Sequence, residues 1–497
     1  MEKEGRIVEE TKDLIEQRRE KLDEIRKFGV EPYPHKYEPT HSTSAIHQDF
    51  ADIEETPDET QTIRVAGRIM TKRDHGKSSF AHLQDSEGKI QIYVRRDKVG
   101  AEPYKIYRRF DTGDIVGAEG TVFRTRTGEL TVLVDSIELL SKSIRPLPEK
   151  WHGLQDKQTR YRQRYADLIM NPEVKDVFLK RTQIVQAIRD MLNAQNFIEV
   201  ETPVLQPIYG GANARPFTTY HNTLEQSLYL RIANELYLKR LIVGGFDRVY
   251  EFSRDFRNEG MDRDHNPEFT MLELYQAYAD YIQIMELTEN LIANTAKTIH
   301  GTTKIPYQEH ELDLTPPWRR LSMVDAVREY SSIDPTALSA DELYKAAVDA
   351  GIDLAGDETK GKIIAELFDT FVESKLIQPT FITDHPIEVS PFAKKKPEDP
   401  EFVERFEFFI CGMEVGNAFS ELNDPIDQRQ RFLEQASSLE AGDDEAFMVD
   451  EDYLRALEYG MPPTGGLGIG IDRLTMLLTN QYSIRDVILF PQMRPES

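Results

Sequence analysis

The stretch EFSRDFRNEGMDRDHNPEFTMLELY, residues 251–275, places the strongest constraint on the fold. Two segments with alternating apolar side chains flank a polar connection that contains glycine, asparagine and proline, which favour turns. Residues i and i+2 of a strand share a face, so an antiparallel hairpin turns alternate side chains toward one pocket. On the first strand these are Arg257 and Glu259. On the second strand they are Phe269, Met271, Glu273 and Tyr275.

The chemistry of this face indicates a kind of ligand. The donors of arginine form a fork that suits a phosphate or a carboxylate. Phenylalanine offers a plane on which a base can stack, and glutamate accepts hydrogen bonds from an amine. The set therefore matches a nucleotide together with an amino-bearing substrate. The alternative is a surface hairpin whose charges are solvated.

A second hairpin is predicted in FEFFICGMEVGNAFSELNDP, residues 406–425. Glu407 lies in its first strand and Glu414 opens the second, where Asn417, Phe419 and Glu421 alternate on one face. The apolar neighbours imply burial, and a buried carboxylate needs a partner. Two glutamates beside a triphosphate would suit magnesium, which takes few carboxylates together with phosphate oxygens and water.

The segment GGLGIGIDRLTMLL, residues 465–478, is predicted to be a glycine-rich strand that runs into a helix. Gly466, Gly468 and Gly470 leave the backbone bare, so that a ligand can lie close to it. Arg473 follows at the start of the helix. The spacing fits neither the dinucleotide-binding fingerprint nor a P-loop, which excludes both classes of nucleotide site.

The N-terminal part is predicted to begin with an amphipathic helix over residues 6–28. Its polar face carries Arg18, Arg19 and Lys21, which would be solvated or would contact RNA weakly. Residues 62–141 then predict five short strands separated by turn residues, which is typical of a small barrel such as an OB-fold.

Aromatic and basic residues mix within this barrel. Phe80 and Tyr93 would stack with the bases of single-stranded nucleic acid, and nearby cations would hold its backbone. These aromatic residues could equally belong to the barrel core. The polar residues around them are Arg68, Lys72, Arg73, Gln91 and Arg95.

The formal net charge of −26 argues against nucleic acid as a partner. However, residues 61–150 hold 17 basic and 12 acidic side chains, so this stretch is locally basic. The single cysteine, Cys411, excludes an internal disulfide and a cysteine-rich zinc site. The start MEKEGRIVEETKDL has no apolar signal-peptide core and no run is long enough to span a bilayer, so we expect a cytoplasmic protein without a membrane partner.

Three motifs carry a family resemblance. NFIEVETPVL with Pro203, the FRNE…HNPEF hairpin and GLGIGIDR resemble motifs 1, 2 and 3 of class II aminoacyl-tRNA synthetases, in that order. The barrel is similar to the anticodon-binding domain of the subclass that contains the lysyl, aspartyl and asparaginyl enzymes. NELYLKRLIVGGFDRVYEFSRDFRNEG and GNAFSELNDP are most similar to lysyl members.

The resemblance implies an α+β fold in which an OB-fold barrel precedes a catalytic domain built on an antiparallel sheet of six or more strands. The expected divisions are a helical extension (1–60), the barrel (61–145), a linker (146–165) and the catalytic domain (166–497) with a helical insertion near 320–376. The expected activity is the ATP-dependent activation of L-lysine and its transfer to tRNA(Lys), by a homodimer with Pro203 at its interface.

The resemblance also implies a role for each candidate residue. Catalysis is expected from Arg257 and Arg473. The ATP site would comprise Arg257, Glu259, His265, Phe269, Glu407 and Arg473. The lysine site would comprise Gly211, Glu235, Glu273, Tyr275, Asn417, Phe419 and Glu421. Glu407 and Glu414 would hold up to three Mg²⁺ ions, and the anticodon would meet Arg68, Phe80 and Gln91.

Three alternatives are weighed against this expectation. An aspartyl or asparaginyl synthetase would need cations where the acidic set Glu235, Glu273 and Glu421 stands, whereas this set suits a dication. A ligase that acts on a protein lysine would lack the barrel. A catalytically inactive RNA-binding paralogue would have degenerate motifs. One departure from the family is Asp264, where some members carry a basic residue; Arg263 could substitute, or a γ-phosphate contact could be missing.

Overall fold

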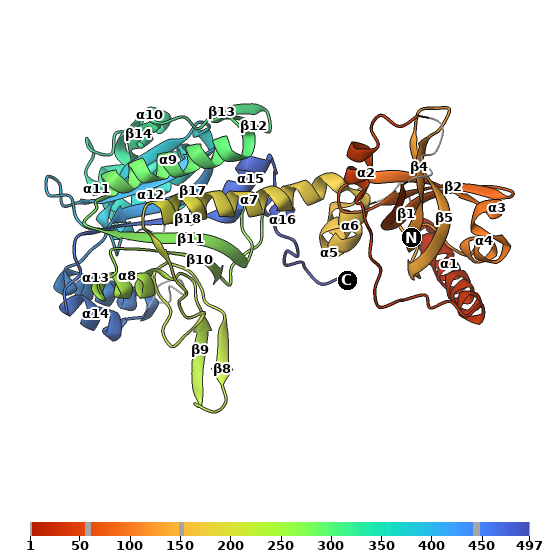
Figure 1. Cartoon of the computed structure of the whole chain (residues 1–497). Coiled ribbons are helices and arrows are strands. Elements are labelled where there is room, and N and C mark those ends of the chain that lie inside the picture. Colours follow the sequence, from red (N-terminus) through yellow and green to blue (C-terminus); the bar gives the residue numbers. More distant parts are fainter. Residues whose placement is uncertain are drawn as a thin grey trace. The chain divides into compact units, whose positions relative to one another are not determined.

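The computed structural model describes residues 2–54, 61–148, 154–354, 356, 358–440 and 448–496. The chain forms two compact units, Met1–Gly153 and Leu154–Ser497, so the division falls inside the expected linker. Each unit is described by itself (Figure 1). Among the described residues, no helix has the length and apolar character that a membrane crossing requires.

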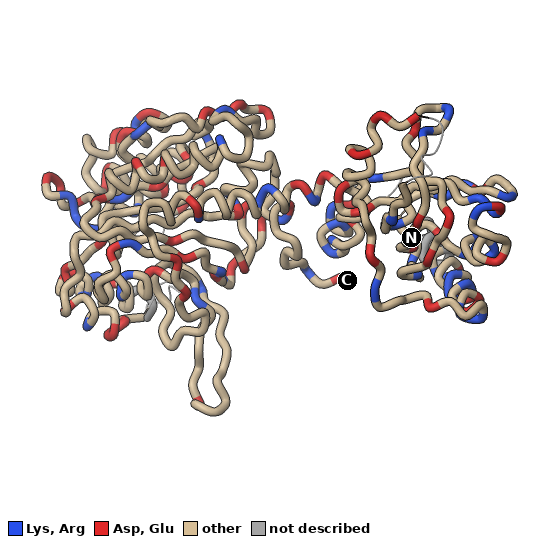
Figure 2. Tube along the Cα trace, viewed as in Figure 1, with Lys and Arg blue, Asp and Glu red and all other residues tan. Residues whose placement is uncertain are grey.

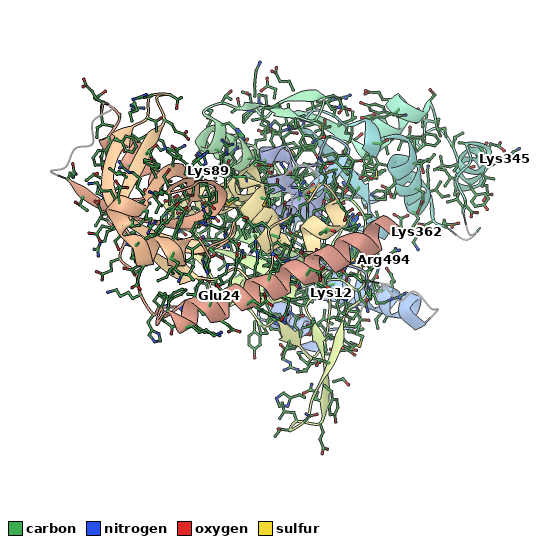
Figure 3. The ribbon with its side chains drawn as sticks, turned by 90° about the vertical axis from the view of Figure 1, so that its right-hand side faces the viewer. Lys12, Glu24, Lys89, Lys345, Lys362 and Arg494 are labelled. Carbon is green, nitrogen blue, oxygen red and sulfur yellow. The ribbon has the colours of Figure 1, made fainter. Side chains whose placement is uncertain are left out.

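The predicted N-terminal helix is present as α1, Glu2–Lys27, and Figure 3 labels Lys12 and Glu24 along it. Its basic residues are not all free. Arg18 is buried and donates to the backbone carbonyls of Thr112, Ser143 and Arg145 at 2.9–3.3 Å. Lys21 pairs with Asp111 at 2.5 Å. The prediction of a solvated or RNA-binding face is therefore wrong for Arg18 and Lys21, because both fasten the helix to the barrel.

The predicted five-stranded barrel is confirmed. Its strands close in the order β1-β2-β3-β5-β4, with β3 and β5 parallel and the other pairs antiparallel. Alternate residues of each strand fill the interior, as the burial of β2 shows. The strands are β1 (Thr62–His75), β2 (Ser78–Gln84), β3 (Lys89–Arg95), β4 (Ile115–Arg124) and β5 (Leu130–Ser141). The helices of this unit besides α1 are α2 (Thr43–Asp49), α3 (Arg96–Val99) and α4 (Ala101–Tyr107).

The second unit is built on the predicted large sheet. Eight strands lie in the order β14-β15-β16-β17-β18-β11-β10-β6. The central pairs are antiparallel, whereas the edge strands β6 and β14 pair in parallel with their neighbours, which makes the sheet mixed. The strands are β6 (Ile198–Glu199), β10 (Arg248–Phe256), β11 (Glu268–Ala277), β14 (Arg319–Ser322), β15 (Thr380–Pro386), β16 (Phe402–Ile410), β17 (Met413–Ser420) and β18 (Thr464–Gly470).

The two faces of this sheet differ. On one face, Leu272 and Leu274 of β11 join a core formed with α7 (Pro172–Ala194), α9 (Tyr281–His300) and α15 (Ile471–Thr479). On the other face, the alternate residues Glu273 and Tyr275 point away from that core. Helices α8 (Glu235–Val243) and α14 (Glu451–Glu458) pack on this second side (Figure 1). Polar side chains of the sheet are therefore left to line a site.

The expected helical insertion consists of α10 (Met323–Ser331), α11 (Ala340–Asp349) and α12 (Lys360–Phe371). Ser322, Ser339 and Thr359 cap the three helices through their side-chain oxygens. The helices share an apolar cluster of their own, which Ile382 of β15 and Phe409 of β16 join. Lys345 and Lys362, labelled in Figure 3, are exposed on α11 and α12.

The remaining elements of this unit are short or peripheral. They are α5 (Lys157–Arg162), α6 (Arg164–Met170), β7 (Leu205–Gln206), β8 (Thr218–His221), β9 (Gln226–Leu230), β12 (Lys304–Tyr307), β13 (His310–Asp313), η1 (Glu373–Lys375), η2 (Ile387–Val389), α13 (Pro425–Glu440) and α16 (Ile484–Val487).

Candidate active site

A cavity of about 430 Å³ lies on the polar face of the sheet. Strands β11, β16, β17 and β18 supply its floor. Every residue that the sequence assigned to ATP, lysine or magnesium lines this one cavity, although their positions span more than 260 residues of chain. They are Gly211, Glu235, Arg257, Glu259, His265, Phe269, Glu273, Tyr275, Glu407, Glu414, Asn417, Phe419, Glu421 and Arg473.

Arg257 reaches the cavity from a loop and not from a strand. Strand β10 ends at Phe256, and the next backbone N–H, that of Arg257, donates to Pro267 at 2.9 Å. Proline has no N–H to return, so the ladder stops there. The predicted strand alternation of Arg257 with Glu259 is therefore wrong, although both residues line the cavity. The guanidinium of Arg257 lies 5.2 Å from the ring centre of Phe269.

Arg473 is held in place by its neighbours. It donates to the backbone carbonyl of Glu414 at 2.5 Å and to Nε2 of His265 at 2.9 Å. Arginine has no acceptor, so Nε2 of His265 must accept. The neutral ring then carries its proton on Nδ1, which donates to Asp262 at 2.8 Å. These contacts fix the guanidinium of Arg473 beside Glu414, at the start of the second strand of the hairpin 406–425.

A β-bulge brings the two predicted metal ligands to one face. Glu407 lies opposite Asn417, but the register shifts between Phe408 and Phe409, so that Glu414 lies opposite Phe409. Without this shift, strict alternation would turn Glu414 away from Asn417. Bulges commonly re-aim a side chain beside a functional site.

The acidic region around Glu407 and Glu414 extends onto the insertion. Burial and the charge of Glu407 raise the pKa of Asp369, in α12, to about 7. Burial and the charge of Glu414 likewise raise the pKa of Glu373. The insertion therefore contributes two carboxyl groups to the electrostatics of the site, which the sequence did not indicate.

Arg405 is a further residue that sequence reasoning missed. It donates to Glu407 at 2.6 Å, to Asn417 at 3.0 Å and to the carbonyl of Val389 at 2.7 Å. Arg405 thus links the expected metal ligand to the expected amino-acid site. The signal was available, since residues 405 and 407 share a strand face.

The other end of the cavity is acidic. Glu273 is buried, and its carboxylate receives only long hydrogen bonds, from the backbone N–H of Asn234 at 3.4 Å and from Tyr275 at 3.3 Å. No cation among the described residues pairs with it. Burial and the charge of Asp255 raise the pKa of Glu273 well above its usual value. A buried carboxyl in this environment holds its proton unless a cation lies beside it, so a cationic ligand would stabilise its ionised form.

Lys239 is a second residue that the sequence analysis missed. Its ammonium forms ion pairs with Glu235, four residues earlier on α8, and with Glu421. The side chain is fully buried, whereas Oε1 of Glu421 has no hydrogen-bond partner among the described residues. The i, i+4 spacing of Glu235 and Lys239 was the available signal.

Two of the glycines that line the cavity, Gly466 and Gly211, pack against its acidic side chains. A Cβ at Gly466 would lie 2.0 Å from Oε1 of Glu421 and 2.6 Å from the Tyr275 ring, so these side chains occupy the space expected for a ligand. Gly468 and Gly470 remain open to the cavity. Gly211 has φ +92° and packs against Glu235, where a Cβ would come within 3.2 Å.

Arg263 does not take the place of a basic residue at position 264. Its guanidinium donates to both carboxylate oxygens of Asp264 at 2.6–2.9 Å and lies over the ring of Tyr482. Asp264 lines the cavity and Arg263 does not. Because Arg263 is paired with Asp264, the arginines of these two motifs that line the cavity are Arg257 in the hairpin and Arg473 in the glycine-rich motif.

The barrel has a groove of its own. Phe80 stacks on Tyr93 with ring centres 4.2 Å apart, and Gln91 donates to Glu129 at 2.5 Å. The groove is lined by Thr71, Arg73, His75, Phe80, His82, Gln91, Thr125, Arg126, Thr127 and Glu129.

Two of the basic residues that the sequence places near Phe80 do not line this groove. Arg68 lies elsewhere and donates to the carbonyl of Gly113 at 2.7 Å. Lys72 is buried and donates to the carbonyls of Tyr107 and Phe110. Arg68 shares the outer face of the sheet with Phe80 but lies opposite Gln84, four residues along β2, whereas Arg73 lies opposite Phe80 and lines the groove.

Comparison with known proteins agrees with both units. Residues 156–494 match the family model of the class II tRNA synthetases (D, K and N). The chain belongs to this family. Residues 63–140 match the model of the OB-fold nucleic acid binding domain, which confirms the predicted architecture.

Curated relatives cover nearly the whole chain. A protein of Pelotomaculum thermopropionicum named lysine–tRNA ligase is 58% identical over 98% of this chain and 96% of its own length. Lysine–tRNA ligases of Thermoanaerobacter sp. (strain X514) and Moorella thermoacetica are 57% and 56% identical over 98% of this chain, and over 97% and 99% of their own lengths.

Proposed function

We propose that this class II synthetase is a lysine–tRNA ligase, which converts L-lysine and ATP to lysyl-adenylate and pyrophosphate and then transfers lysine to tRNA(Lys). The observation that carries the substrate choice is Glu273, a buried carboxylate without a cation partner among the described residues, at the end of a cavity that also holds Glu235 and Glu421. A substrate with a terminal ammonium group would satisfy it.

The cavity suits a reaction that needs no general base. The carboxylate of lysine attacks the α-phosphorus of ATP, the bond to the pyrophosphate oxygen breaks, and pyrophosphate leaves. Arg257 would stabilise the charge that develops on the α-phosphate, while Phe269 and Arg473 would enclose the adenine. Glu259 and His265 would contact the nucleotide. Catalysis of this kind rests on positioning and electrostatics.

The acidic cluster beside these residues fits magnesium. Glu407 and Glu414 share one face, and the raised pKa values of Asp369 and Glu373 show that negative charge accumulates there. Magnesium takes few protein carboxylates together with phosphate oxygens and water, so these two glutamates would hold it beside the phosphates of ATP. Bound Mg²⁺ would neutralise phosphate charge. Exchange that continued in excess chelator would contradict this assignment.

Amino-acid-dependent ATP–pyrophosphate exchange without tRNA tests the proposal, with each of the twenty amino acids in turn. Exchange with lysine alone is the expected result. Exchange with aspartate or asparagine would assign the chain to a sister activity of the same family. No exchange with any amino acid, even after tRNA is added, would favour an inactive RNA-binding protein.

The barrel groove is the proposed site for the anticodon of tRNA(Lys). Phe80→Ala removes one stacking plane, and such a plane contributes about 1–3 kcal/mol per base, so we expect KM for tRNA to rise roughly 10-fold to 100-fold. Lysine-dependent exchange, which needs no tRNA, should stay within a factor of two. Phe28→Ala, an exposed aromatic residue of the same unit outside the groove, is the matched control. Equal KM values for the two variants would contradict this assignment.

We also propose that the chain works as a homodimer in the cytoplasm, where ATP, lysine and tRNA are available. Strand β6 forms an open edge of the sheet, and apolar residues near it are exposed. The hairpin β8–β9 carries almost no charge along its length (Figure 2). A mass of one chain, 57.3 kDa, in sedimentation equilibrium at micromolar concentration would exclude the dimer. The exposed residues are Leu179, Ile198, Pro203, Val204 and Leu205.

A further inference from the structure

Lys239 occupies an unusual place beside the amino-acid end of the cavity. Its partners Glu235 and Glu421 line the cavity, whereas Lys239 itself does not. The ammonium therefore sits behind the two carboxylates, on the side away from the substrate. Four aromatic rings enclose it, with centres at 4.9–6.0 Å: Phe392, Phe419, Tyr275 and Tyr453. Its side chain is 0% exposed, so bulk solvent does not reach the ammonium.

The charges around this point can be counted. When ionised, Glu235, Glu273 and Glu421 carry three negative charges at this end of the cavity, and Lys239 carries one positive charge, so the count applies to these four side chains. The excess is two negative charges, which equals the number of ammonium groups on lysine. In the proposed function, the carboxylate of the substrate would lie at the other end, toward Arg257. Three uncompensated carboxylates would exceed what the substrate can neutralise, and buried charge without compensation is costly.

We propose that Lys239 is a positioning residue for substrate specificity: it neutralises one carboxylate from behind, so that the pocket presents two negative charges to a substrate with two ammonium groups. The proposal rests on the proposed function, because it takes lysine as the substrate. It assigns Lys239 no contact with the substrate and no part in the phosphoryl chemistry.

The electrostatics of the neighbouring groups support this role. Burial alone would lower the pKa of Lys239, but the charges of Glu235 and Glu421 outweigh burial and raise it. Burial raises the pKa of Glu421, and the positive charge of Lys239 opposes that rise. The same two effects act on Glu235, with a smaller contribution from Arg405 of β16. The other titratable groups that face Lys239 are Tyr275 of β11 and Tyr453 of α14.

Removal of the cation should therefore change the proton balance of lysine binding. In Lys239→Met, each of Glu235 and Glu421 holds its proton to a higher pH than in the wild type, because the cation no longer opposes the effect of burial and only the smaller effect of Arg405 on Glu235 remains. Lysine must displace that proton. Calorimetric titration of lysine in two buffers with different ionisation enthalpies counts the released protons, and we expect the variant to release about one more proton than the wild type.

The same change should appear in the kinetics. In lysine-dependent exchange at pH 7 we expect KM for lysine to rise by at least about 10-fold in Lys239→Met, since each pKa unit above the pH reduces the ionised fraction about tenfold. The penalty should shrink as pH rises to 8.5, because the ionised form then returns. KM for ATP should stay within a factor of two. Lys239→Arg, which keeps the charge, should restore the affinity and the proton count.

Two further variants separate this role from a structural one. Lys142 of the barrel is equally buried and pairs with Asp111 and Asp114, so Lys142→Met is the matched control and should leave KM for lysine unchanged. The double variant Lys239→Met/Glu421→Gln restores the excess of two charges and removes one of the two carboxylates that lose their partner in the single variant. It should fold even if the single variant does not, and it should bind lysine more tightly than Glu421→Gln alone.

The outcomes are distinct. A wild type that binds lysine, with Lys239→Met equal to it in affinity and proton count, overturns the inference and leaves the proposed function intact. A double variant that binds lysine more weakly than Glu421→Gln also overturns it, because the two charges would then act independently. A wild type that binds no lysine overturns the proposed function and this inference together.

Discussion

Replacement of Arg257 by alanine should reduce kcat for lysine-dependent exchange by about 1,000-fold, the order expected when a cation that stabilises a phosphoryl-transfer transition state is lost. Arg257 is the cation that the cavity holds beside Phe269. Its buried Nε has no hydrogen-bond partner among the described residues, so this donor is free for a ligand. Charge develops on the α-phosphate only as the bonds change, so kcat should fall more than affinity.

Arg254→Ala is the matched control for this variant. Arg254 precedes Arg257 by three residues, is exposed on β10 and pairs with Glu268 at 3.4 Å. Arg257→Lys should recover little activity, because the ammonium of lysine cannot form the two parallel hydrogen bonds of a guanidinium. An Arg257→Ala variant with kcat within tenfold of the Arg254→Ala value would contradict the assigned role.

The second large effect concerns Glu273. In Glu273→Gln we expect KM for lysine to rise by about 100-fold, since a buried charge pair with the substrate ammonium is replaced by a neutral contact worth some 3 kcal/mol less. KM for ATP should change less than twofold, because the nucleotide lies at the other end of the cavity. Exchange kinetics with lysine and ATP varied in turn would give both constants.

The pH dependence follows from the direction of the pKa shift. Burial raises the pKa of Glu273, so the carboxyl holds its proton to a higher pH in the fold than in the unfolded chain. Lysine needs the ionised form, so the wild-type KM should fall as pH rises from 6 to 8. The raised pKa also means that Glu273 costs stability once pH exceeds its unfolded pKa. The Tm of Glu273→Gln should therefore exceed that of the wild type at pH 8.

Glu268→Gln controls for the substitution itself, because Glu268 begins the same strand and is partly exposed. This variant should keep the wild-type KM and its pH dependence. A Glu273→Gln variant that binds lysine normally, with a Tm unchanged at pH 8, would show that the carboxylate is neither the ammonium partner nor an ionised buried group.

The sequence predicts most of the framework, because alternation and turn chemistry are local properties. The five barrel strands and the cavity-facing residues of β11 follow from a period of two. The resemblance of the three motifs to class II synthetases gave the proposed ATP and lysine residues, and all of them line one cavity, since each motif lies on or beside a strand of the same sheet.

The errors arose where tertiary structure interrupts a local pattern. Pro267 ends a ladder that alternation would extend to Arg257, and a bulge re-aims Glu414. Lys239 appears in the sequence as one charge on a helix, and only the fold brings Glu421 to it from 182 residues away. Arg68 has a cationic side chain that would suit RNA, but its guanidinium donates to the backbone carbonyl of Gly113.

The anchoring of α1 has a consequence for any attempt to isolate the RNA-binding module. Arg18 donates hydrogen bonds to three backbone carbonyls at the two ends of the segment 112–145. Lys21 forms an ion pair with Asp111, which also pairs with Lys142. A fragment limited to residues 61–145 would leave these carbonyls without their donor, and it would lose the ion pair between Lys21 and Asp111. A fragment designed to fold independently should therefore begin upstream of Arg18. Helix α1 is an integral part of the barrel domain and not a removable extension.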